Sequence, residues 1–112
     1  MDNQTPDPVF RALADSTRRA ILERLGRGDA SVTDLAAPFA MALPSFLKHI
    51  RLLEETGLIR SRKAGRTRTC TLQRAPLAMV DDWLARQRSQ WEQHADRLEQ
   101  FVIGKSQEGW PE

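Results

Sequence analysis

Cationic side chains are concentrated in the middle of the sequence. Residues 43–74 carry eight lysine and arginine residues and only two acidic ones, a net charge of +6, whereas the segments before and after them carry −1 and −3. A protein surface that binds a polyanion, above all a nucleic acid, needs such a concentration of positive charge. Charge alone leaves a second interpretation open, in which the cations cluster by chance and are simply solvated.

The residue patterns that catalysis or metal binding require are missing from the sequence. It has no nucleophile beside a base, no pair of catalytic carboxylates and no phosphate-binding loop, so we expect neither an enzyme nor a cofactor. The only cysteine is Cys70, interpreted as a small strand residue rather than a redox sensor. Glu92, His94 and Asp96 lack a second histidine, so we interpret them as solvated groups and predict no metal site.

Length and hydropathy set the expected organisation. The 112 residues suit one domain, predicted over residues 8–103 between a tail at 1–7 and a flexible tail at 104–112. No apolar run approaches the ~18 residues that cross a membrane, and the polar, acidic first residues do not suit a signal peptide. A single cysteine fits a reducing compartment. We therefore expect a cytoplasmic protein with no membrane contact.

Capping and turn signals divide the first half of the chain into short helices. Helices are predicted over residues 8–13 and 17–27, and a third begins at Ser31, whose Ser-Val-Thr-Asp sequence has the form of a capping box. Pro38 stops that third helix. A fourth helix, predicted over residues 43–56, has a proline in its first turn and a glycine directly after its end.

The second half changes from helical to strand periodicity and back. Residues 58–62 and 67–72 are predicted strands, joined by a Lys-Ala-Gly-Arg hairpin tip at 63–66. Pro76 then opens a last helix that runs to about residue 102. The fold class is therefore mainly α with a small β-hairpin wing, a winged helix-turn-helix.

Two segments resemble one known family. Residues 10–25, FRALADSTRRAILERL, resemble the opening of the arsenic-repressor-type (ArsR) winged-helix regulators, and residues 48–59, KHIRLLEETGLI, resemble their recognition helix and following strand. The resemblance covers about residues 8–102 and implies a dimeric bacterial repressor that binds operator DNA and often controls its own operon. Metal-sensing members often carry a cysteine pair before the recognition helix, and residues 31–37 contain none. Leu47 stands where many members have a small polar residue.

The fourth helix has the two faces that DNA reading requires. On a helical wheel Leu43, Phe46, Ile50 and Leu53 share an apolar face, which we expect to pack on the core. The opposite face and its flanks are polar and cationic, and the side chains expected to contact double-stranded DNA are Pro44, Ser45, Lys48, His49 and Arg51. The plain alternative is an amphipathic surface helix with solvated cations. For His49 a hydrogen bond to a neighbouring backbone group and a DNA contact both remain open.

The predicted hairpin carries five cations and no acidic residue. We expect Arg62, Lys63, Arg66 and Arg68 to meet phosphates or a narrow minor groove, with Arg60 a weaker candidate. The same charges also protect an edge strand from aggregation, and both roles are compatible.

Near-heptad apolar spacing in the last helix predicts a homodimer through the first and last helices. The expected interface residues are Phe10, Leu13, Leu77, Val80, Trp83, Leu84, Gln87, Trp91, Leu98 and Phe101. A monomer whose long helix folds back on its own core is the alternative.

For function, the expectation is a sequence-specific repressor at an imperfect inverted repeat in a promoter, not responsive to metal. A winged helix for protein contact alone and a repressor released by metal or ligand are the rivals.

Overall fold

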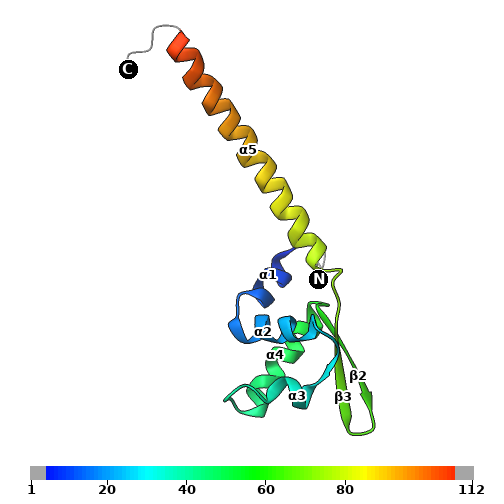
Figure 1. The fold of residues 1–112 in the computed structure, drawn as a ribbon. Helices are drawn as coiled ribbons and strands as arrows, with labels where there is room; N and C mark the ends of the chain where they lie inside the picture. Colours follow the sequence, from blue (N-terminus) through cyan, green and yellow to red (C-terminus); the bar gives the residue numbers. More distant parts are fainter. Residues whose placement is uncertain (1–4, 108–112) are drawn as a thin grey trace. The chain divides into compact units, whose positions relative to one another are not determined.

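The computed structural model describes residues 5–107 (Figure 1). In the order of the chain, the elements of this part are α1 (Asp7–Leu13), α2 (Ser16–Leu25), β1 (Ala30–Ser31), α3 (Val32–Ala36), α4 (Leu43–Glu55), β2 (Ile59–Ala64), β3 (Thr67–Leu72) and α5 (Leu77–Gln107). The chain divides into two units at Val80, so α5 begins in the first unit and continues through the second. Among the described residues no helix combines the length and the apolar character that a bilayer demands.

The helix boundaries follow from local capping chemistry. Asp15 caps α2, because its carboxylate accepts the Arg18 backbone N–H at 3.0 Å. Ser31 caps α3 in the same way, and its hydroxyl accepts the Asp34 N–H at 3.0 Å. The helix α4 ends where Gly57 adopts a φ of 80°, a conformation that favours glycine. The predicted third and fourth helices are thereby confirmed to within a residue or two.

The hairpin β2–β3 belongs to a three-stranded antiparallel sheet of order β1-β3-β2, in which β3 is the central strand. Ala64 pairs with Thr67, leaving a two-residue loop whose first residue, Gly65, has a φ of 64°, as a type II′ turn requires. The two-residue strand β1 pairs with β3 through Ala30 and Cys70. Sequence reasoning did not find β1, since two residues carry no periodicity.

One core joins the helices to the sheet in the first unit. Helices α2 and α3 lie beside β3, and α4 lies beside α2 and β2 (Figure 1). The ring of Phe46 in α4 stands 5.6 Å from that of Phe39, centroid to centroid. The buried apolar residues are Val9, Ala12, Ile21, Leu25, Ala30, Leu35, Phe46, Ile50, Leu53, Leu58, Ile59, Cys70 and Val80.

Two expectations about the ends of helices were wrong. Leu43 was expected on the core face of the fourth helix, but 56% of its surface is exposed, because it occupies the first turn where no element covers it. The last helix was expected to end near residue 102, but α5 continues through Gly104 to Gln107. One glycine in a long helix costs only about 1 kcal/mol, which does not end it. Residues 108–112 of the predicted flexible tail lie outside the described residues.

Candidate nucleic-acid interface

The helix α4 presents a polar face away from the core. Phe46, Ile50 and Leu53 are buried, with at most 3% of their surface exposed, and they fix the helix from behind. Four of the side chains predicted to contact DNA are exposed on the other side, and we call them the reading face: Pro44, Ser45, Lys48 and Arg51. Leu47 and Leu52 are half-buried. Because the apolar side is held, the polar side keeps a defined orientation, as a helix that enters a major groove requires.

The hairpin β2–β3, called the wing below, is a cationic projection. Arg60, Arg62, Lys63, Arg66 and Arg68 are all exposed. In the strand register Lys63 lies directly opposite Arg68. Two like charges at directly opposed positions destabilise a hairpin unless an anion lies between them. The wing therefore carries a local excess of positive charge that a phosphate would relieve.

A chain of hydrogen bonds connects the wing to α4. The Ser61 hydroxyl donates to Glu54 Oε2, and Arg68 Nη1 donates to the Ser61 hydroxyl oxygen at 3.0 Å. Glu54 lies one turn after the reading face, so these hydrogen bonds connect the last turns of α4 to both strands of the wing. The side chains of Arg51 and Arg68 line one hollow between these elements, together with Leu47, Ile50 and Glu54. These shared contacts hold the cationic side of α4 and the cationic wing in a fixed position relative to each other.

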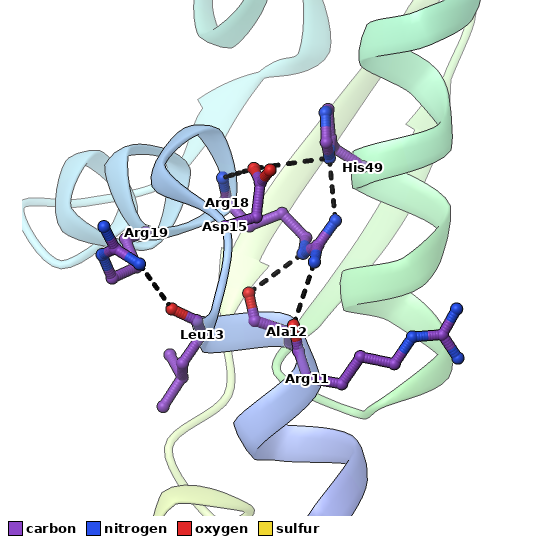
Figure 2. Close-up of polar contacts among 7 residues, drawn as sticks. All are labelled: Arg11, Ala12, Leu13, Asp15, Arg18, Arg19 and His49. Atoms are coloured by element: carbon purple, nitrogen blue, oxygen red, sulfur yellow. Dashed lines mark hydrogen bonds and ion pairs between the residues drawn. The ribbon is translucent and has the colours of Figure 1, made fainter.

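His49 is held from inside the protein. Arg18 Nη1 lies 3.0 Å from His49 Nδ1, and the Asp15 carboxylate lies 3.7 Å from the same nitrogen (Figure 2). The partner of His49 is therefore the distant Arg18 side chain, and not the neighbouring backbone group that the sequence left open. Its other nitrogen is not used in these contacts, so the predicted DNA contact of His49 stays a prediction.

Two titratable groups next to the interface have shifted pKa values. The backbone N–H of Arg18 lowers the pKa of the Asp15 carboxyl, with partial desolvation opposing and the nearby His49 and Arg18 charges adding to the lowering. Burial raises the pKa of the Cys70 thiol, and the Glu54 carboxylate adds to the rise. A fully buried thiol with a raised pKa is a poor nucleophile, which agrees with the interpretation of Cys70 as a small strand residue.

Comparisons with known proteins match this geometry. Residues 13–62 match the family model described as a helix-turn-helix domain. The HTH-type transcriptional regulator Rv2034 of Mycobacterium tuberculosis is 39% identical over 77 residues, which are 69% of this chain and 72% of the relative. The transcriptional repressor SdpR of Bacillus subtilis is 37% identical over 57 residues, 51% of this chain and 63% of that protein.

A solved structure gives the decisive likeness. The crystal structure of the ArsR family transcriptional regulator RHA00566 superposes with a TM-score of 0.75 at 56% identity, over 77% of this chain and 89% of that one. The chain belongs to the ArsR family. As an ArsR-family member it is a DNA-binding transcriptional regulator with a winged helix-turn-helix, as the sequence predicted, and its relatives are regulators rather than enzymes.

Sequence reasoning missed the polar residues that connect α4 of this ArsR-family chain to α2 and to the wing. Arg18, Glu54 and Ser61 are part of the hydrogen-bond system but were not singled out. The sequence showed the Asp-x-x-Arg spacing from Asp15 to Arg18, and strand alternation placed Ser61 on the opposite face from its arginine neighbours. Neither pattern identifies a partner on another element. Within residues 5–107 no three His, Cys, Asp or Glu side chains form a group suited to a metal ion.

The predicted dimer residues differ in exposure along the chain. Phe10, Leu13 and Leu77 are half-buried, and Val80 is already buried within one copy of the chain. In α5 Trp83, Leu84 and Gln87 are half-buried, whereas the later ones are exposed: Trp91, Leu98 and Phe101.

Proposed function

We propose that this ArsR-family chain represses transcription by binding, as a homodimer, an imperfect inverted repeat in a promoter, including that of its own operon. The observation that carries the proposal is the reading face: a polar and cationic helix surface held by a fully buried apolar back, beside a cationic wing. Repression is supported by the similarity to SdpR, which is named a transcriptional repressor. Control of its own operon is the part of the proposal that the family resemblance implies.

The reading face and the wing divide the contacts with DNA. Ser45 and Lys48 lie in the first two turns of α4, the part of a recognition helix that reaches base edges. Arg51 lies one turn later and suits a phosphate. On the wing the expected phosphate contacts are Arg62, Lys63, Arg66 and Arg68, because long flexible cations at a hairpin tip reach the backbone without discriminating bases.

The apolar side of α5 supplies the dimer contact. Leu84, Trp91, Leu98 and Val102 lie within about 40° of one another around the helix axis. Trp91, Leu98 and Val102 are each more than half exposed, a large apolar load for one helix. A second copy of the same helix covers such a stripe through a two-fold interface. Phe10 and Leu13 of α1 are the further predicted contributors.

Metal does not control this repressor. The helix α3 and its cap, residues 31–36, contain no cysteine, whereas metal-sensing members often have a cysteine pair before the recognition helix. Cys70 lies in β3 with no exposed surface, so it is not available to an incoming thiophilic ion. We expect zinc, cadmium and arsenite to leave DNA binding unchanged.

Selection from a random duplex pool tests the function directly. The full chain should enrich an inverted repeat with half-sites about 10 base pairs apart, centre to centre, because a two-fold dimer places its recognition helices in successive major grooves. Lys48→Ala should abolish the enrichment, whereas Arg88→Ala, which removes an exposed cation from α5, should preserve it. Failure of the wild-type chain to enrich any sequence would contradict the proposal. Release of the enriched duplex by micromolar zinc, with the dimer intact, would overturn the claim about metal.

A further inference from the structure

A single guanidinium joins three helices behind the reading face. Arg18 Nε donates to the Ala12 carbonyl at 2.9 Å, and Nη2 donates to the Arg11 carbonyl at 2.9 Å (Figure 2). These carbonyls belong to the last turn of α1, where a helix offers few backbone partners, although the Arg11 carbonyl also accepts the Ala14 N–H at 3.3 Å. The third nitrogen, Nη1, is directed at His49 of α4. Arg18 thus connects the end of α1, the start of α2 and the recognition helix.

The chemistry of this contact sets the proton position on His49. A guanidinium only donates hydrogen bonds, so Nδ1 accepts from Arg18 and the neutral imidazole carries its proton on Nε2. An ion pair with Asp15 would require a proton on the same Nδ1, which excludes the Arg18 bond. The Arg18 contact at 3.0 Å has hydrogen-bond length and the Asp15 contact at 3.7 Å does not, so the Arg18 bond prevails.

We propose that Arg18 is a positioning residue for DNA binding: it fixes the ring and the tautomer of His49, so that α4 presents an Nε2–H donor of set direction beside Lys48. This inference rests on the proposed function. In Figure 2 the second ring nitrogen points away from Arg18 and Asp15, and the side chain keeps 22% of its surface exposed. A fixed donor suits acceptors on DNA, such as the O6 and N7 atoms of guanine or a phosphate oxygen.

Nitrogen-15 NMR of the two histidine rings tests the tautomer. In the wild-type protein we expect His49 to be protonated on Nε2 and not on Nδ1 at a pH where it is neutral. Arg18→Lys removes the planar group that bonds three acceptors at once, so the ring should change to a mixture of tautomers. Arg19→Lys is the matched control, because Arg19 donates to the neighbouring Leu13 carbonyl at 2.8 Å and does not contact His49. A wild-type ring protonated on Nδ1 would overturn the inference, whatever the variants do.

A double-mutant cycle tests the effect on DNA. His49→Ala removes the ring, and with it both the Nδ1 acceptor and the Nε2–H donor. On a duplex enriched by the wild-type chain, Arg18→Lys should weaken binding about tenfold, the value of one charge-assisted hydrogen bond. The same change in the His49→Ala background should weaken it by less than about twofold, because no ring donor is left to position.

The outcomes of this cycle are distinguishable from those of the function test. An equal loss from Arg18→Lys in both backgrounds would show that Arg18 only stabilises the fold, and would refute the positioning role. Unchanged affinity of Arg18→Lys in the wild-type background would refute it as well. Failure of the wild-type chain to enrich any duplex would instead refute the proposed function, while the NMR result would still report on the Arg18–His49 contact.

Discussion

Removing the Asp15 cap should destabilise the protein by an amount that its contacts define. The Asp15 carboxylate accepts the Arg18 N–H at 3.0 Å at the start of α2, and loss of such a cap costs about 1 kcal/mol. Its attraction to the nearby Arg18 charge adds only a few tenths of a kcal/mol, because both side chains are partly exposed and screened by water. Asp15→Ala should therefore lower the free energy of unfolding by about 1 to 1.5 kcal/mol, or the Tm by roughly 4–8 °C.

The same contacts give the effect a definite pH dependence. The folded-state pKa of Asp15 is lowered below its ordinary value of 3.8, so the ionised form stabilises the folded protein. This contribution is fully present well above pH 3.8 and is lost as the pH falls through the lowered pKa. Asp15→Asn keeps a capping oxygen but no charge, so it should cost less than Asp15→Ala at neutral pH. It should also lose the part of the acid sensitivity that comes from this carboxyl.

Urea unfolding followed by circular dichroism, at one fixed protomer concentration and between pH 3 and 7, measures both effects. Asp29→Asn is the control, since Asp29 is an exposed acid in the connection between α2 and β1. Equal stability of Asp15→Ala and wild type at neutral pH would refute the reasoning about the cap. An acid sensitivity of Asp15→Asn equal to that of the wild type would refute the reasoning about charge.

Two further predictions concern the wing and the dimer. Ser61→Ala removes the hydroxyl that links Glu54 and Arg68, so it should lower the free energy of unfolding by about 1 kcal/mol in the same assay. A stability equal to that of the wild type would show that these hydrogen bonds make no net contribution to stability. Trp91→Glu should weaken self-association about a hundredfold or more in sedimentation, because each copy then places a charge in the apolar stripe. Ser89→Glu, on the opposite side of α5, should leave self-association unchanged. A soluble Trp91→Glu variant that remained an unchanged dimer would place the interface elsewhere.

Elements whose signals are local were predictable from the sequence. Ser31 and Gly57 marked helix boundaries because a cap and a positive φ depend only on neighbouring residues. The buried face of α4 followed from the spacing of Phe46, Ile50 and Leu53, since that periodicity is a property of one helix. The cationic wing was visible as a cluster of charges around a glycine turn.

Features that depend on partners far along the chain were not predictable. The strand β1 exists because Ala30 pairs with Cys70, which lies forty positions further along the sequence. The exposure of Leu43 reflects the lack of a covering element and not its own chemistry. The contact of Arg18 with His49 spans 31 positions, and no spacing rule relates the two residues.

A salt titration of DNA binding tests the central claim, that the reading face discriminates sequence while the wing binds phosphates. Wild type, Lys48→Ala and Arg66→Ala are compared on the enriched duplex and on a random duplex. We expect Lys48→Ala to lower the ratio of specific to random affinity. Arg66→Ala should weaken both alike and reduce the salt slope by roughly one for each phosphate that the variant no longer neutralises, or about two in a dimer. An unchanged ratio for Lys48→Ala together with a collapsed ratio for Arg66→Ala would contradict the account and assign sequence recognition to the wing.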